Sequence, residues 1–256
     1  MAYTAEQTAI LEREPQPPQG TTSAEVAYEV DGTACSGYVA RPDDDATHPG
    51  VLVVHNWLGV TDAVRFRCDM LARLGYVAFA VDVFGAEVRP TEAEAPGVAV
   101  GFYGDLELFR TRLEGGLEQL LAQPGVDAGR TAAMGYCFGG SGALQLARTG
   151  ADLKGVVSFH GALQTGPEGE ADLIRAKVLV LTGAVDPVVP PEAVDAFEDE
   201  LRGAPGVDWQ VVTYSSSMHA FTEPGVDAPD HGAQFNAAAE ARSWQAMKSF
   251  FAEVLV

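Results

Sequence analysis

The sequence predicts an α/β fold in which helices cover both faces of a mainly parallel central sheet and an N-terminal hairpin adds antiparallel strands. Two observations predict this fold. Short continuous apolar runs, typical of strands buried on both faces, alternate along the chain with segments of helical spacing. Ahead of them, two segments of alternating polarity meet at Asp31-Gly32, which is a strong hairpin turn signal.

The predicted elements follow one another without an internal repeat or a linker, so residues 23–256 are expected to form a single domain. Strands are expected at Glu25–Val30, Cys35–Ala40, Val51–His55, Val77–Val81, Thr131–Gly135, Gly155–Phe159, Val178–Thr182 and Trp209–Tyr214. Helices are expected at Val64–Leu74, Leu106–Leu121, Gly140–Arg148, Glu192–Leu201 and roughly 234–256. Residues 1–22 include a proline-rich stretch that disfavours regular structure, and we expect them to form a surface arm.

The composition restricts the classes of partner. The 256 residues include 16 Lys and Arg against 36 Asp and Glu, which gives a formal net charge of −20. A negative surface repels nucleic acid and anionic membranes, so neither is expected as a partner. No apolar run approaches the roughly 20 residues of a membrane span, and the first residues lack the features of a signal peptide.

The cysteines favour a cytoplasmic location. Cys35, Cys68 and Cys137 are an odd number and lack the spacing of a disulfide framework or a metal site. We therefore expect a protein of a reducing compartment, with no metal and no cofactor. A monomer or a small homo-oligomer is expected.

A candidate nucleophile lies in Gly135-Tyr136-Cys137-Phe138-Gly139, between a predicted strand and a predicted helix. This is the form of the nucleophile elbow, Gly-x-Ser-x-Gly, with cysteine in place of serine. The turn is so tight that side chains at both glycines would collide with neighbouring backbone. The alternative is a glycine-rich turn around a buried, inert cysteine. Core packing accounts for Cys35 and Cys68.

The acid and the base are expected downstream of Cys137. Asp186 follows the predicted strand Val178–Thr182, and Pro187 stops the chain from continuing as a strand or helix. His219 follows the next strand, so the order nucleophile, acid, histidine of this elbow fold is kept. His219 would accept the thiol proton and Asp186 would fix its tautomer. Taken alone, each residue is also explained as an ordinary turn aspartate or loop histidine.

Two backbone N–H groups are candidates for stabilising an anion on the substrate carbonyl. One belongs to Phe138, which follows the nucleophile, and the other to Trp57 in the loop after the third strand. Trp57 is equally well explained as a core aromatic. Among the remaining histidines, His160 ends a strand and is a candidate for lining the pocket, whereas His231 is expected at the start of the final helix as a capping or surface residue.

Five segments resemble the dienelactone hydrolase family, and the similarity runs from about Glu25 to the C-terminus. They are His55-Asn-Trp-Leu-Gly59, Asp82-Val-Phe-Gly85, Met134-Gly-Tyr-Cys-Phe-Gly-Gly140, Gly183-Ala-Val-Asp-Pro187 and Met218-His-Ala-Phe221. The resemblance implies an α/β-hydrolase fold without a large lid domain. It also implies a triad of Cys137, Asp186 and His219 with Phe138 and Trp57 as oxyanion donors.

The chain departs from the family pattern at its substrate-binding positions. Members that cleave dienelactone carry a glutamate where this chain has Asn56, and arginines that bind the substrate carboxylate. The matching stretches here contain Glu87 and Glu223, which would repel an anion, with Arg89 nearby. The candidates for contacting substrate are Asn56, Phe84, Arg89, His160 and Phe221.

The sequence therefore predicts a hydrolase that cleaves a small ester or lactone through an acyl-cysteine intermediate. The alternatives are a thioesterase or acyltransferase on the same triad, and a non-catalytic binding protein of the same fold. Specificity is expected in the loops 84–103 and 160–177, which carry no readable motif.

Overall fold

The structure is a computed structural model that describes residues 3–256. The chain divides into two compact units, the first ending at Thr131 and the second running from Ala132 to Val256, and each is described separately. Across residues 3–256, every helix is too short or too polar to cross a membrane.

The first unit contains a hairpin followed by a parallel pair of strands. Its elements are α1 (Ala5–Leu11), β1 (Thr21–Val30), β2 (Thr33–Pro42), β3 (His48–Val54), α2 (Asp62–Arg73), β4 (Val77–Val81), α3 (Ala95–Gly104) and α4 (Leu106–Leu121). The strands lie in the order β1-β2-β4-β3, with β1–β2 and β2–β4 antiparallel and β3–β4 parallel. Asp31 (φ 48°) and Gly32 (φ 72°) form the predicted turn between β1 and β2.

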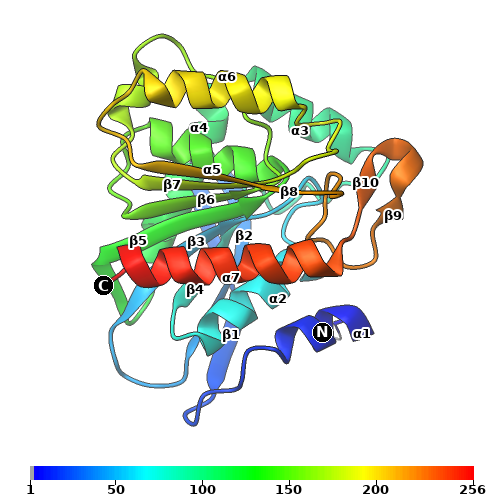
Figure 1. Ribbon diagram of the computed structural model, residues 1–256. Coiled ribbons are helices and arrows are strands. Elements are labelled where there is room, and N and C mark those ends of the chain that lie inside the picture. The colour runs from blue at the N-terminus through cyan, green and yellow to red at the C-terminus, as the bar shows by residue number, and fades with distance from the viewer. Residues whose placement is uncertain (1–2) are drawn as a thin grey trace. The chain divides into compact units, whose positions relative to one another are not determined.

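Helices α2 and α4 pack on opposite sides of β4 (Figure 1). Both faces of β3 and β4 are therefore covered, and Val51–Val54 and Ala78–Val81 have no exposed surface. This burial explains why both strands are continuous apolar runs in the sequence. Arg112 of α4 donates hydrogen bonds to the carbonyl of Val30 and the hydroxyl of Thr33, so the hairpin turn is tied to this helix.

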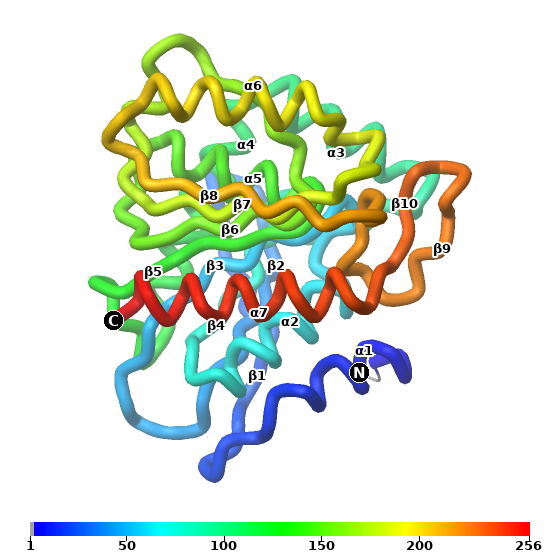
Figure 2. The backbone as a smooth tube through the Cα atoms, in the orientation of Figure 1, coloured from blue at the N-terminus to red at the C-terminus, as the bar shows by residue number. Residues whose placement is uncertain are grey.

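The expectation of an irregular arm at residues 1–22 is wrong for Ala5–Leu11, which form α1. A capping box starts this helix: Thr4 accepts a hydrogen bond from the Gln7 N–H, and the Gln7 side chain accepts one from the Thr4 N–H. The helix lies beside α2 (Figure 2), where Arg73 donates to the carbonyls of Leu11 and Glu14. The proline-rich residues after α1 are irregular up to β1, as predicted.

Helix α3 has no counterpart among the predicted elements and lies in the second half of the segment 84–103, which was expected to be a specificity loop. Ala95, Ala99 and Phe102 are its buried residues, and the Phe102 ring packs on Phe84 at 5.4 Å between centroids. The helix anchors this segment to the first unit.

The second unit contains a fully parallel set of strands. Its elements are β5 (Val126–Tyr136, which begins before the boundary), α5 (Phe138–Arg148), β6 (Gly155–Phe159), a 3₁₀ turn at Glu170–Leu173, β7 (Lys177–Gly183), α6 (Pro191–Arg202), β8 (Trp209–Tyr214), β9 (Asp227–Ala228), a 3₁₀ turn at Pro229–His231, β10 (Ala233–Gln234) and α7 (Ala237–Val254). The order is β5-β6-β7-β8, and each neighbouring pair is parallel. Helices α5 and α6 lie on one side of these strands and α7 on the other (Figure 1).

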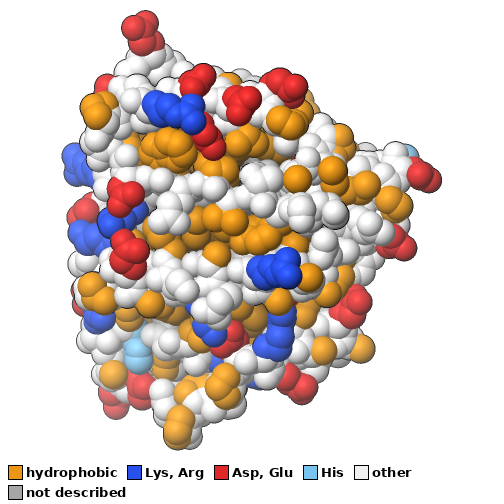
Figure 3. Space-filling model, in the orientation of Figure 1, with side chains coloured by type: hydrophobic (Ala, Val, Ile, Leu, Met, Phe, Trp, Pro, Cys, Tyr) orange, Lys and Arg blue, Asp and Glu red, His pale blue; other side chains and the backbone are white. Residues whose placement is uncertain are grey.

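The strands of the second unit differ in burial. β6 is buried throughout, whereas β8 is the last strand in the order and is only half-buried. Figure 3 shows apolar side chains on either side of the β8 backbone, towards α6 and towards α7. The exposed polar residues Gln210 and Thr213 of β8 are consistent with this edge position.

The final helix begins later than predicted. His231 does not open it: Pro229–His231 form a short 3₁₀ turn within the β9–β10 hairpin, which the sequence did not reveal. Helix α7 starts at Ala237, where the Asn236 side chain accepts hydrogen bonds from the N–H groups of Ala238 and Ala239. Asn236 is a strong N-cap residue, so the sequence carried this start signal.

The predicted fold class is confirmed. All the strand pairs described for β3–β4 and β5–β8 are parallel, the N-terminal hairpin is antiparallel, and helices flank the strands of each unit. The carboxyl ends of parallel strands are where ligands gather in such folds, and the candidate residues follow these ends.

A buried ion pair holds helix α6 in the second unit. Arg148, 1% exposed, makes a bidentate contact with Glu200 at 2.7 Å through both nitrogens, and Glu200 also accepts the N–H of Gly166. We predict that Glu200→Ala destabilises the fold by about 3–5 kcal/mol, because it leaves the Arg148 charge buried without its partner. Urea unfolding measures the change in free energy.

The matched control is Glu198→Ala on the same helix. Glu198 pairs with Arg202, which is 55% exposed, so the loss is expected to be below about 1 kcal/mol. Equal destabilisation by the two substitutions would contradict the distinction between the buried and the exposed pair.

Candidate active site

Cys137 lies in the turn between β5 and α5 with backbone angles φ 53° and ψ −116°. This left-handed conformation is costly for a residue with a side chain, and it lifts the sulfur out of the line of the strand. A Cβ atom on Gly135 would lie 2.1 Å from the carbonyl oxygen of Gly139, so only glycine fits there. The predicted elbow geometry is present, and Cys137 is partly exposed, unlike buried Cys35 and Cys68.

His219 and Asp186 lie next to this sulfur. The Nε2 atom of His219 is 3.0 Å from the Cys137 sulfur, and its Nδ1 atom is 2.9 Å from Oδ2 of Asp186. The imidazole therefore bridges a thiol and a carboxylate. The structure brings together the three residues that the sequence singled out, each at the carboxyl end of a different strand.

Asp186 is fixed by its own hydrogen bonds. Its side chain has no exposed surface, and Oδ1 accepts the N–H groups of Val188 (2.8 Å) and Val189 (3.1 Å). Oδ2 is thereby directed at His219. An acid held in this way sets the orientation and tautomer of the histidine.

The loop of His219 is held by the β9–β10 hairpin. The His219 N–H donates to the carbonyl of Gly232, and the His219 carbonyl accepts the N–H of Gln234, both at 3.0 Å. Gly232, at φ 75°, also packs against Pro187: a Cβ atom there would lie 2.1 Å from the Pro187 ring. The hairpin therefore contacts both the loop of the base and the loop of the acid.

Burial and hydrogen bonding act in opposite directions on His219. Burial alone lowers its pKa, but the hydrogen bonds and negative charges of Asp186 and Cys137 outweigh burial and raise the pKa from 6.5 to about 10. These interactions favour the protonated ring at neutral pH.

Two predicted substrate contacts in this unit are core residues. His160 and Phe221 have no exposed surface, and their rings pack edge to face at 5.2 Å. The prediction that they contact substrate is not supported, because neither side chain reaches the surface. Phe138, a candidate oxyanion donor, is the first residue of α5.

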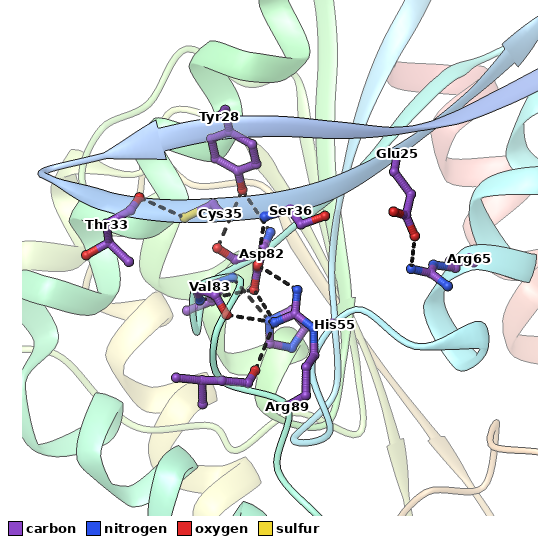
Figure 4. A network of polar contacts seen from close by, with 12 residues as sticks. Glu25, Tyr28, Thr33, Cys35, Ser36, His55, Arg65, Asp82, Val83 and Arg89 are labelled. Carbon is purple, nitrogen blue, oxygen red and sulfur yellow. Dashed lines mark hydrogen bonds and ion pairs between the residues drawn. The ribbon is translucent and has the colours of Figure 1, made fainter.

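In the first unit, His55 organises the loop that carries Asn56 and Trp57. Its Nδ1 atom lies 2.6 Å from the Asn56 carbonyl, and its Nε2 atom accepts the N–H of Val83 after β4 (Figure 4). Burial is the main cause that lowers the pKa of His55, to about 4, so the ring is neutral. The Asn56 side chain accepts the N–H of Leu58, which shapes the turn. Trp57 is 37% exposed, so it is not a core aromatic.

Arg89 is engaged within the protein. It forms an ion pair with buried Asp82 (2.9 Å) and donates to the carbonyls of Gly85 and Val88 (Figure 4). Asp82 in turn accepts the N–H groups of Ser36 and Gly85. The expectation that Arg89 contacts substrate receives no support, because its guanidinium is already paired with Asp82 and with two backbone carbonyls.

Phe84 lies in the same region and is 5% exposed, with its ring edge against His55 at 4.6 Å. This prediction of a substrate contact also receives no support. The pairing of Asp82 with Arg89 was not predicted, although Asp82-Val-Phe-Gly85 is one of the segments behind the family resemblance. Its position directly after β4 was the available signal.

Within residues 3–256, no three His, Cys, Asp or Glu side chains are grouped in a way that could hold a metal ion. The chemistry that the arrangement supports is nucleophilic attack by a cysteine next to a positively charged histidine.

Comparisons with known proteins show which family the chain matches. Residues 35–255 match the model of the dienelactone hydrolase family. A solved structure of a dienelactone hydrolase-like promiscuous phosphotriesterase from metagenomic libraries is 38% identical, with a TM-score of 0.87. The alignment covers 92% of this chain and 99% of that one.

Two curated relatives are more distant in sequence. A putative carboxymethylenebutenolidase of Salmonella typhimurium is 28% identical over 92% of this chain and 89% of its own length. A probable 2-oxo-3-(5-oxofuran-2-ylidene)propanoate lactonase of a Bradyrhizobium species is 26% identical, over 77% of this chain and 83% of its own.

We predict that His219 keeps its proton through neutral pH and titrates near 10, and that Asp186→Asn lowers this midpoint because it removes the carboxylate charge. NMR of ¹⁵N-labelled histidine measures the midpoint, with the signal assigned by its loss in His219→Gln. Exposed Asp195 of α6 provides the control, and Asp195→Asn should leave the midpoint unchanged.

The raised pKa of His219 also makes the stability of the fold depend on pH. Because the folded-state pKa exceeds 6.5, protonation of His219 stabilises the fold fully below about pH 6.5, and this contribution is lost as the pH rises towards 10. A wild-type midpoint near 6.5 would contradict the prediction.

Proposed function

This chain belongs to the dienelactone hydrolase family, and from that premise we propose that it hydrolyses a neutral carboxylic ester or lactone of a small molecule through an acyl-cysteine intermediate. The family and the names of the relatives support a carboxylic ester hydrolase. We also propose that residues 23–256 form one α/β-hydrolase domain, since the family match spans most of them.

One observation carries the proposal: the His219 ring lies between the Cys137 sulfur at 3.0 Å and the Asp186 carboxylate at 2.9 Å. The 3.0 Å contact between the Cys137 sulfur and Nε2 of His219 supports proton transfer that forms a thiolate–imidazolium pair. Such a pair is reactive without an external base.

The reaction follows from these positions. The Cys137 thiolate attacks the carbonyl carbon, and the carbonyl electrons move onto oxygen. When this intermediate collapses, the bond to the leaving alkoxide breaks and His219 gives the alkoxide its proton. Neutral His219 then takes a proton from water as the water attacks the acyl-cysteine, and the acid is released with the thiolate restored.

The anion on the carbonyl oxygen needs hydrogen-bond donors at each step. The backbone N–H of Phe138, at the start of α5, is our first candidate. The family resemblance adds the N–H of Trp57, an assignment that rests on its position in the loop after β3.

Charge supports a neutral substrate. The chain carries a net charge of −20, and Arg89 already pairs with Asp82. Glu223 lies four residues after His219, and Glu87 is exposed after β4. A carboxylate on a substrate bound next to His219 would be repelled by Glu223.

A second candidate function is phosphotriester hydrolysis. The observation in its favour is the similarity to the promiscuous phosphotriesterase, at 38% identity over nearly the whole chain. A phosphotriester is also neutral, and attack by the thiolate on phosphorus would release an alkoxide that His219 protonates. Water, deprotonated by neutral His219, would then attack phosphorus, break the S–P bond and release a phosphodiester with the thiolate restored.

We predict that Cys137→Ala lowers turnover of a chromogenic short-chain ester by at least about 10³-fold, because the nucleophile is lost. Thermal unfolding should remain close to wild type, since the elbow accepts the smaller side chain. Cys35→Ala and Cys68→Ala are the controls: both cysteines are buried and should leave most activity intact. Wild-type turnover by folded Cys137→Ala would refute the acyl-cysteine route.

We predict a preference for neutral over anionic substrates in two matched pairs. One pair is an ester and its carboxylate-bearing analogue, and the other is a phosphotriester and the corresponding phosphodiester. The values of kcat/KM should be higher for the neutral member, because Glu223 and Glu87 repel an anion. Higher values for the anionic members would refute the neutral substrate class, and absence of triester turnover would remove the second candidate.

A further inference from the structure

We propose that His160 is a positioning residue for ester hydrolysis, joining the backbone of the nucleophile to the loop of the catalytic histidine through Thr222. This inference rests on the proposed function, but it concerns residues that neither the triad nor the oxyanion donors include.

His160 occupies a strained and fully buried position. It directly follows β6 with φ 39°, a left-handed conformation that is costly for histidine, and its side chain has no exposed surface. Its own N–H donates to the carbonyl of Leu181 in β7 at 2.8 Å. The neighbouring strands therefore hold the backbone of His160.

The two ring nitrogens of His160 bond in different directions. The Nδ1 atom accepts the backbone N–H of Cys137 at 3.2 Å, an N–H that also donates to the carbonyl of Phe159 at 3.0 Å. The Nε2 atom lies 2.7 Å from the hydroxyl oxygen of Thr222. Thr222 is itself buried, at 2% exposure, and lies three residues after His219.

These contacts fix the tautomer of His160. A nitrogen that accepts an N–H must carry a lone pair, so Nδ1 is unprotonated and the proton is on Nε2. The Nε2–H group then donates to the Thr222 oxygen. His160 is therefore held as a neutral ring. A flip of the ring would break both hydrogen bonds.

A neutral His160 ring avoids electrostatic repulsion with His219. The rings of His160 and His219 meet edge to face with centroids 5.2 Å apart. His219 is the imidazolium of the site, and a second positive ring at this distance would repel it. A neutral His160 packs against His219 without this repulsion.

His160 thus connects, by hydrogen bonds, the backbone of Cys137 to the loop that carries His219. Cys137 needs its left-handed backbone to present sulfur at the turn, and the bond from its N–H to His160 stabilises that conformation. Thr222 lies three residues after His219, so its bond to His160 ties the His219 loop in addition to the backbone bonds from the hairpin. His160 therefore connects the two groups whose separation of 3.0 Å the reaction requires.

The test uses matched substitutions in the full-length protein. Thr222→Val removes the hydroxyl and keeps the shape, whereas Thr222→Ser keeps the hydroxyl. His160→Asn leaves an acceptor near the Nδ1 position, whereas His160→Gln leaves a donor near Nε2. For each folded variant, kcat and KM are measured on a neutral chromogenic ester, together with thermal unfolding and the rate at which iodoacetamide alkylates Cys137.

We expect Thr222→Val to lower kcat by about tenfold, the effect of one lost positioning hydrogen bond, with KM within about twofold. Thr222→Ser should restore most of kcat, and Thr222→Val should also change the alkylation rate of Cys137. His160→Asn and His160→Gln should each retain part of kcat and exceed His160→Ala.

Wild-type kcat and wild-type alkylation rates in folded Thr222→Val would overturn the proposal, and so would equal losses in Thr222→Val and Thr222→Ser. If the His160 variants do not fold, the Thr222 pair still decides. Alkylation requires no substrate, so the positioning role is tested even if wild type shows no ester hydrolysis, a result that would reject the proposed function alone.

Discussion

The second unit of this protein is organised around one buried imidazole. His219 contacts a carboxylate on one side and a sulfur on the other, and these partners raise its pKa to about 10 despite burial. A positive ring in a buried site is stable only while both partners stay in place. Asp186 is held by two backbone N–H groups, the His219 loop by the β9–β10 hairpin, and the Cys137 backbone by Phe159 and His160.

Cys137, Asp186 and His219, which the structure brings together, each carry a local signal in the sequence. The sequence shows a cysteine close to two glycines after an apolar run. It also shows an aspartate and a histidine after two later predicted strands, in the order expected for this elbow. The supporting residues could not be found in this way. Thr222 and Gly232 act through contacts with residues distant in the sequence, and the packing of His160 against Phe221 and His219 likewise has no local signal in the sequence.

The fold was predictable where burial imposes a pattern. β4 and β6 are covered on both faces, so their apolar runs define their limits closely. The prediction failed where short elements depend on capping or on distant contacts. Helix α1 rests on a capping box at Thr4 and Gln7 that was overlooked beside the prolines, and α3 has few buried residues, so its periodicity is weak. The two-residue strands β9 and β10 are too short for any periodicity.

The β9–β10 hairpin is small, but it contacts the loops of both the base and the acid. The hairpin bonds the backbone of His219 and touches Pro187, yet its strands contain two residues each and lie outside the main parallel strands. The residues of its two strands are exposed or partly exposed, so substitutions there affect the loops of the base and the acid without altering the hydrophobic core. We therefore expect substitutions in the hairpin to shift the base and the acid while leaving the apolar core of the second unit in place.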